Sequence, residues 1–547
     1  MNSLKPMLLT SLKSYDRTQF AKDVTAGIIV AIIALPLSIA LALASGVGPE
    51  AGIFTAIVAG FVISALGGSS VQIAGPTAAF ATIVAGIVAK DGLDGLVIST
   101  ILAGIFLILM GLCHFGSLIK FIPYTITTGF TSGIAVTIVI GQLKDFFGVT
   151  YPDGVKPIET TEKFKAFIEN ISTANKDALI VGIVSLAILI ISPMIFKKLP
   201  GSLIAVIIGI LMVKFLPLKV STIGNLYTIS NSLPSFHIPS VNLEVVQNAI
   251  PNAFTIAVLA AIESLLSCVV ADGMINGKHR SDMELVAQGA GNIASALFGG
   301  IPATGAIART AANIKNGGRT PVAGMVHSIT LVIVLVVLMP FAGMIPMPTI
   351  AAILFIVAYN MCQWRTFVHL ICTAPKSDII VLFTTFILTI LFDLVVAIEI
   401  GMVLACLLFI KRMSEETHVD SWVYVDDDTP DVNEHLQKLP LQIRVYEITG
   451  PLFFGAADAI EHIVVKDFTT CLVLRMRSVP AIDSTAMNAL QNLVKVCEGR
   501  GITLVFSHVN EQPMRVMKKA GFVELVGEEN FCPNISAALA HAEGLIK

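Results

Sequence analysis

Residues 299–310 read GGIPATGAIART, and this stretch decides the fold because it interrupts a chain that is otherwise strongly apolar. It holds glycines, small side chains, Pro302 and a single charge, Arg309, between two long apolar runs. Non-helical backbone at membrane depth is tolerated only where it faces protein or a water-filled cavity. A helix that begins there presents unpaired N–H groups and a partial positive charge, so we expect an anion at this start.

Residues 67–80, GGSSVQIAGPTAAF, look like the counterpart of this stretch. They also open on two glycines and reach a proline, Pro76, before an apolar helix of about a dozen residues. Two short, interrupted segments in corresponding halves of a chain point to a transporter's substrate site. The alternative is a pair of glycine-rich helix contacts that bind no ligand.

The composition indicates a polytopic membrane protein, because 55% of the 547 residues are hydrophobic and only 13% are charged. The eight cysteines show no CxxC spacing, so neither a metal site nor a disulfide framework is expected, and no cofactor. HExxH and Walker motifs and a clustered nucleophile and base are missing from the sequence, which argues against an enzyme and against an ATP-driven pump.

The apolar runs predict fourteen membrane segments, seven in each half, with the short segment third in each half. Because seven is odd, the second copy starts on the opposite side of the membrane, so the repeats are inverted. The expected segments are 24–49, 51–66, 76–89, 95–113, 122–143, 178–196, 202–216, 251–271, 284–298, 304–314, 321–341, 347–361, 377–392 and 394–411.

The loop charges place both termini in the cytoplasm, since Lys and Arg gather in the loops that would face inward. We therefore expect a cytoplasmic segment at 1–23, a transport domain at 24–412 in the cell membrane, and an acidic linker at 413–440. Residues 441–547 alternate strand and helix patterns and predict a small soluble α/β domain.

Two ionisable residues are expected inside the membrane, where such residues usually face a cavity. Glu263 lies in the middle of the eighth segment, and Ser267 follows one turn later on the same face. This pair is expected to hold a proton or a cation, although Glu263 could instead pair with a neighbouring helix. Arg309 is expected to meet the substrate or to neutralise Glu263.

The chain resembles the SulP / solute-carrier-26 family of anion transporters with a C-terminal STAS domain. The resemblance runs from about residue 14 to 547 and is carried by 299–314, 317–321, 261–267 with 270–273, and 72–77. It implies a core of segments 1–4 and 8–11, a gate of segments 5–7 and 12–14, and a substrate between the starts of helices three and ten. The implied lining is Leu37, Leu41, Pro76, Thr77, Ala78, Ala79, Gly305, Ala306 and Ile307, with Arg309 behind.

The resemblance also bears on the coupling ion. Sodium-coupled bicarbonate members carry a hydroxyl where this chain has Ile307, while the glutamate at 263 is typical of proton-coupled relatives. We therefore expect proton–anion symport by alternating access, with a sodium-coupled bicarbonate transporter, an exchanger and an anion channel as alternatives. The anion itself stays open among sulfate, bicarbonate and dicarboxylates.

Residues 441–547 resemble a STAS domain, and in this resemblance Ser484 and Thr485 lie where related proteins are phosphorylated, although Ala486 replaces the usual glycine. Both residues are equally expected as plain N-caps of a helix. The domain is expected to serve dimerisation, trafficking or regulation, so the expected partners are the lipid bilayer, the anion, its coupling ion and a second copy of the chain, with no nucleic acid.

Overall fold

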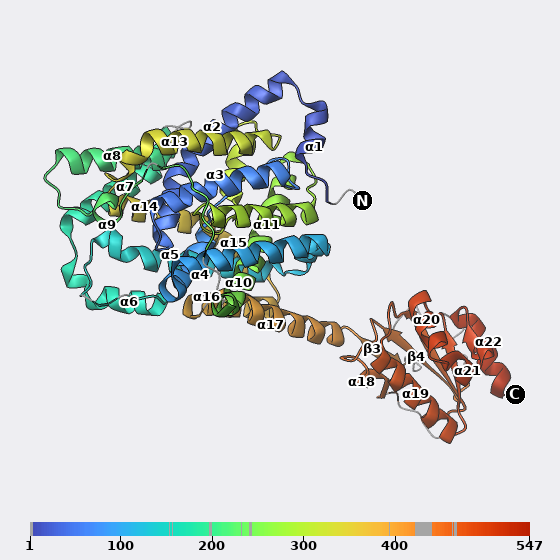
Figure 1. Ribbon diagram of the computed structural model, residues 1–547. Coiled ribbons are helices and arrows are strands. Elements are labelled where there is room, and N and C mark those ends of the chain that lie inside the picture. The colour runs from blue at the N-terminus through green and yellow to red at the C-terminus, as the bar shows by residue number, and fades with distance from the viewer. Residues whose placement is uncertain are drawn as a thin grey trace. The chain divides into compact units, whose positions relative to one another are not determined.

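The computed structural model describes residues 4–152, 154–155, 157–195, 200–230, 232–239, 243–392, 394–421, 440–461, 463 and 468–546. The chain forms two compact units, Met1–Met402 and Val403–Lys547, and each is described by itself. The first unit is helical and the second contains a five-stranded sheet (Figure 1).

One group of helices in the first unit packs around the two interrupted stretches. Within it α2 and α13 run side by side, and α4 and α11 pack closely (Figure 1). The group consists of α2 (Arg17–Ala44), α3 (Pro49–Leu66), α4 (Ala78–Leu112), α10 (Leu243–Ile275), α11 (Ser281–Leu297), α12 (Ile307–Lys315) and α13 (Val322–Ala342).

A second group of helices in this unit packs around α5, which contacts α7, α14 and α16. Its members are α5 (Tyr124–Phe147), α7 (Lys176–Ile195), α8 (Gly201–Phe215), α14 (Met347–Cys362), α15 (Trp364–Thr373) and α16 (Lys376–Leu391). Helix α17 (Leu394–Glu415) follows α16 and spans the boundary between the two units. Short elements precede the first group, connect the two groups or lie between helices of the second: α1 (Leu8–Ser11), η1 (Leu12–Ser14), η2 (Phe115–Phe121), α6 (Thr160–Glu169), η3 (Ile171–Thr173) and α9 (Ile223–Leu226).

The helix α4 contains both the third and the fourth predicted segments. Gly92 breaks it with φ 71° and ψ −171°, a conformation that side chains with a Cβ rarely adopt. With this division, fourteen helical segments fall at the predicted places, and the third in each half is short. Within the described residues, eight helices are long and apolar enough to cross a membrane by themselves.

Several boundaries differ from those predicted, and two of these differences concern the site and the second unit. Helix α12 begins at Ile307 instead of residue 304, because Thr304–Gly305 form the strand β2. Helix α17 continues to Glu415, and His418–Ser421 form the strand β3, so the expected linker at 413–440 begins inside folded structure. Residues 422–439 of that linker lie outside the described residues.

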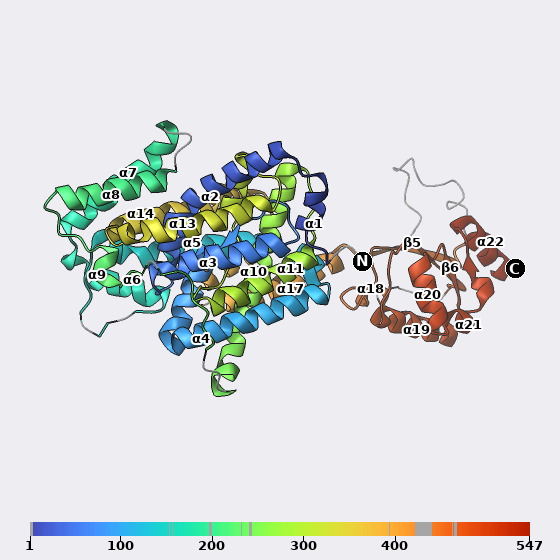
Figure 2. The ribbon, with the colours of Figure 1, turned by 45° about the horizontal axis from the view of Figure 1, so that its top comes forward.

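The second unit combines a sheet with helices (Figure 2). The strand order of the sheet is β3-β4-β5-β6-β7. Strand β3 is antiparallel to β4 and the remaining pairs are parallel. A large apolar core joins one face of the sheet to α19, while the core on the other face contains α22. The remaining bounds are β4 (Ile443–Thr449), α18 (Asp458–Glu461), β5 (Cys471–Ser478), α19 (Ser484–Gly499), β6 (Thr503–Ser507), α20 (Glu511–Lys519), α21 (Phe522–Val526), η4 (Glu528–Asn530), β7 (Phe531–Cys532) and α22 (Ile535–Ile546).

Candidate functional site: two facing helix starts

The two interrupted stretches meet in the first unit as a short antiparallel pair of strands. Strand β1 (Ala74–Gly75) pairs with β2 (Thr304–Gly305), with Ala74 opposite Gly305. The amide of Ala306 also donates to the carbonyl of Ile73 at 2.9 Å. This pairing satisfies backbone groups that a membrane interior would leave unpaired. It also fixes the starts of α4 and α12 beside each other, because each helix begins within three residues of its strand.

Neither helix start is capped by a side chain. The N-cap residues are Thr77 for α4 and Ala306 for α12, and neither side chain accepts a hydrogen bond from its helix. No side-chain cap therefore competes with an anion for the amides of the first turns, and the helix dipoles favour negative charge at both starts.

The predicted lining residues surround these starts with small side chains. Pro76, Ala78, Ala79, Gly305 and Ala306 are buried, while Thr77 is partly exposed. Ile307 is 41% exposed at the first turn of α12. Leu37 and Leu41 lie on α2, just beyond Pro36, and α2 packs against both α4 and α12.

Glu263 of α10 reaches the start of α4. Thr77 Oγ1 donates to Glu263 Oε2 at 2.9 Å, which joins the carboxylate predicted to face a cavity to the predicted anion site. Ser267 lies one helical turn further along α10, and its buried hydroxyl has no hydrogen-bond partner. The geometry thus connects Glu263 to the helix start directly, whereas Ser267 has no contact of this kind.

Arg309 lies behind the strand pair. Its side chain is buried, with 4% exposed, and Nη2 donates to the carbonyl of Pro76 at 2.8 Å. The other terminal nitrogen, Nη1, is buried without a hydrogen-bond partner. Gly75 leaves room for this guanidinium, because a Cβ there would lie 2.5 Å from Nη1. Arg309 therefore ties α12 to the stretch before α4 and supplies positive charge close to both starts.

Polar side chains that sequence reasoning missed hold the strand pair from outside. Asn292 binds both the amide and the carbonyl of Ala303, at 2.8 and 2.9 Å. Thr310 accepts from the amide of Ile73 at 3.0 Å, and Asn313 donates to the carbonyl of Val71 at 2.9 Å. Their positions could have been predicted from the sequence, because polar residues in a membrane segment usually face protein or a cavity.

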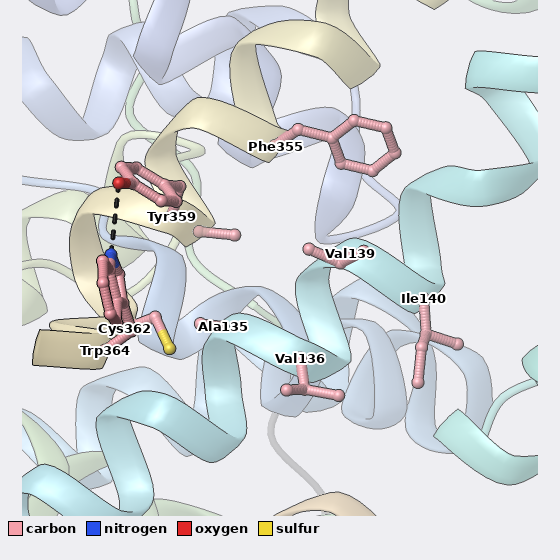
Figure 3. Close-up of a pocket in the computed structure, with 9 residues that line it drawn as sticks. Ala135, Val136, Val139, Ile140, Phe355, Tyr359, Cys362 and Trp364 are labelled. Atoms are coloured by element: carbon pink, nitrogen blue, oxygen red, sulfur yellow. Dashed lines mark hydrogen bonds between the residues drawn. The ribbon is translucent and has the colours of Figure 1, made fainter. Parts of the chain in front are cut away.

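A cavity of about 420 Å³ lies in the other helix group, between α5, α14 and α15. Figure 3 shows its apolar wall and the hydrogen bond from Trp364 Nε1 to the Tyr359 hydroxyl, which is 3.2 Å long. Its lining contains none of the predicted substrate residues. It is therefore separate from the site at the facing helix starts.

In the second unit, Ser484 and Thr485 are exposed in the first turn of α19. The N-cap of this helix is Asp483, whose side chain accepts from the amide of Ala486 at 2.9 Å. The plain capping role expected of the two hydroxyl residues is therefore wrong, because a carboxylate one position earlier already fills it.

Comparison with known proteins identifies the family of this chain. The sequence profile described as the sulfate permease family matches residues 20–385, and that of the STAS domain matches residues 437–538. The chain belongs to the sulfate permease family. This confirms the resemblance seen in the sequence.

Relatives in the sulfate permease family match along most of this chain. A putative sulfate transporter, YvdB of Bacillus subtilis, is 38% identical over 534 residues, covering 95% of this chain and 97% of the relative. The bicarbonate transporter BicA of Picosynechococcus is 33% identical over 491 residues, covering 86% of each chain. These relatives are transporters, so the expectation that the chain is not an enzyme is confirmed.

A solved structure shows the same fold. The murine solute carrier 26 family member A9 anion transporter, in its inward-facing state, matches with a TM-score of 0.87 at 18% identity, covering 99% of this chain and 94% of the other. The likeness confirms the predicted class: a polytopic helical protein of two inverted seven-segment repeats with a C-terminal STAS domain.

Proposed function

We propose that this sulfate permease family member is a secondary active transporter that carries a small anion across the cell membrane by proton-coupled symport. The observation that carries the proposal is the antiparallel pairing of β1 with β2, which sets the uncapped starts of α4 and α12 side by side. The relatives named for sulfate and bicarbonate support a small oxyanion as the substrate.

The proposed anion site recognises charge through backbone amides and through nearby Arg309. Most of its side chains are small and apolar, namely those of Ala78, Ala79 and Ala306. Such a lining offers few side-chain hydrogen bonds, so it selects negative charge and size more than chemical identity. Sulfate, bicarbonate and dicarboxylates are therefore all candidates, with sulfate favoured by the most similar of the relatives described above.

Glu263 is the proposed proton carrier. It contacts Thr77 at the start of α4, so its charge acts directly on an anion bound there. Two like charges about 4–8 Å apart repel by roughly 2–4 kcal/mol at an effective dielectric constant of about 20. Protonation of Glu263 removes this repulsion, so the proton and the anion bind together and leave together.

A sodium-coupled bicarbonate transporter is the second candidate. It is favoured by Glu263 and Ser267, because both side chains offer oxygen atoms that a sodium ion could bind. The half-exposed Ile307 argues against it, because an isoleucine side chain offers no oxygen to a cation. We propose proton coupling for this reason.

We further propose that the group of α2, α3, α4 and α10–α13 is the moving core and that the helices around α5 are the gate. Each group packs mainly within itself, which suits the relative motion that alternating access requires. We also propose cytoplasmic termini, a homodimer to which the STAS domain contributes, and a regulatory modification at the exposed Ser484 or Thr485.

Uptake into liposomes containing the purified protein tests the proposal. Radiolabelled sulfate, bicarbonate and succinate are offered with an inward proton gradient or an inward sodium gradient, for the wild type and for Glu263→Gln. We expect one anion to accumulate with the proton gradient and Glu263→Gln to abolish this accumulation. The matched control is Glu169→Gln, an exposed carboxylate on α6.

Two results would overturn the proposal. Uptake that follows the sodium gradient and ignores pH would establish the second candidate. Large single-channel currents without accumulation against a gradient would establish an anion channel.

A further inference from the structure

A second carboxylate, Glu284 of α11, is fully buried among hydrogen-bond donors. Its contacts come from the amides of Gly68 (2.9 Å) and Ser69 (3.2 Å), Gln72 Nε2 (2.8 Å), Ser264 Oγ (3.2 Å) and Gln288 Nε2 (3.0 Å). Five donors around two oxygens suit an ionised carboxylate, which only accepts hydrogen bonds. Burying a charge is costly unless hydrogen bonds satisfy it, so these donors are needed to keep Glu284 charged inside the protein.

The donors around Glu284 belong to three segments that must keep their places for transport. Gly68, Ser69 and Gln72 lie in the stretch between α3 and β1. Ser264 lies on α10, directly after the proposed proton carrier Glu263, and Gln288 is one turn along α11. Glu284 therefore joins the first interrupted stretch to the helix that carries the coupling carboxylate.

Gln72 extends this connection to the second interrupted stretch. Its Nε2 donates to Glu284 Oε1 and to Ser264 Oγ, each at 2.8 Å, and its Oε1 accepts from Cys268 Sγ at 3.3 Å. The same amide lies against Gly305 of β2, where a Cβ would come within 2.3 Å of Nε2. The Gln72 amide thus packs directly against β2 and links it to Glu284.

From these contacts we infer that Glu284 is a positioning residue of the transport site. It holds Gln72 under β2 and Ser264 beside Glu263, so that the two helix starts face one anion and Thr77 stays within reach of Glu263. This inference rests on the proposed function, and it adds that a carboxylate outside the anion site determines the affinity for the anion.

The test compares Glu284→Gln with a matched buried carboxylate. A glutamine at 284 keeps the shape but turns one acceptor into a donor that faces other donors. We expect the KM for the transported anion to rise about tenfold or more, per amount of folded protein, because misplaced helix starts lose binding energy. The control is Asp23→Asn, since Asp23 is equally buried and accepts from Tyr15, Gln19 and Thr320. It should lower thermal stability and leave the KM near that of the wild type.

A charge exchange separates positioning from simple stability. Because Gln72 and Glu284 touch, the double variant Gln72→Glu/Glu284→Gln again places one carboxylate against one amide, and we expect it to recover a large part of the lost affinity. If Glu284→Gln does not fold, the exchange variant and Ser264→Ala supply the KM values, with Ser264→Ala expected to raise the KM by about threefold to tenfold.

The outcomes distinguish this inference from the proposed function. A wild type that accumulates no anion would defeat the proposed function itself. A transporting wild type with a normal KM in Glu284→Gln, or in Ser264→Ala where Glu284→Gln does not fold, would overturn the positioning role alone. An exchange variant that recovers folded yield but not the KM would also overturn it.

Discussion

The hydroxyl of Thr77 and the carboxylate of Glu263 meet at 2.9 Å, where the start of α4 touches the middle of α10. This contact links the helix dipole that would hold an anion to the group that would hold a proton. In the proposed mechanism, a change of charge on Glu263 would therefore act directly on the backbone amides proposed to bind the anion.

Replacing Thr77 tests the link. Thr77→Val keeps the shape and removes the donor, so Glu263 loses a hydrogen bond worth roughly 1.5–3 kcal/mol, and we expect proton-driven uptake to fall about tenfold or more. Thr77→Ser keeps the hydroxyl and should transport nearly as well as the wild type. Equal uptake by the valine and serine variants would show that the contact plays no part in transport.

The close packing at β2 gives a second prediction. A Cβ on Gly305 would lie 2.3 Å from Gln72 Nε2, so Gly305→Ala must displace the Gln72 amide from its hydrogen bonds with Ser264, Glu284 and Cys268 or shift β2. We expect a loss of uptake of about tenfold, equivalent to roughly 1.4 kcal/mol, because overpacking a rigid site costs about 1–3 kcal/mol. Gly86→Ala in α4 is the control, since a Cβ there meets nothing within 4 Å. Similar uptake rates for the two variants would argue against a tightly held strand pair.

The sequence predicted the fold well because its signals were local. Glycine-rich stretches ending in a proline located both interruptions, and long uncharged runs located the helices. The pairing of Ala74 with Gly305 could not be predicted from local patterns, because it joins two segments that are far apart in the sequence. For the same reason the sequence predicts Glu284 only as the first residue of a membrane segment. In the structure its carboxylate accepts hydrogen bonds from donors in three segments.

Two buried cysteines of the second unit, Cys471 and Cys497, are expected to react slowly with alkylating reagents. Burial, and then the neighbouring thiols of Cys497 and Cys532, raises the pKa of Cys471 to about 12, and burial raises the pKa of Cys497 to about 11. Since the thiolate is the reactive form, both should resist alkylation at about pH 8 and react only as the pH approaches these values. Mass spectrometry after iodoacetamide treatment should find the exposed Cys113 modified before Cys471 and Cys497. Early labelling of Cys471 in the folded protein would contradict this.

A stable STAS fragment should include the strand β3, which pairs with β4 at the edge of the sheet. His418–Ser421 pair with Tyr446–Thr449 of β4, so a fragment that starts at residue 441 leaves that edge of the sheet uncovered. We expect a fragment of 413–547 to be more stable than one of 441–547 by roughly 1–3 kcal/mol in urea unfolding, and less prone to aggregate. Identical midpoints for the two fragments would show that β3 adds nothing to the domain.

The proposed anion site lies between the first turns of α4 and α12. Hydrogen–deuterium exchange on the reconstituted wild type, with and without the transported anion, probes these turns because bound amides exchange slowly. We predict that the anion slows exchange in both 78–79 and 307–309 and leaves exchange around Phe355, in the apolar cavity, unchanged. Unchanged exchange in both segments at a saturating anion concentration, or protection confined to another region, would contradict it.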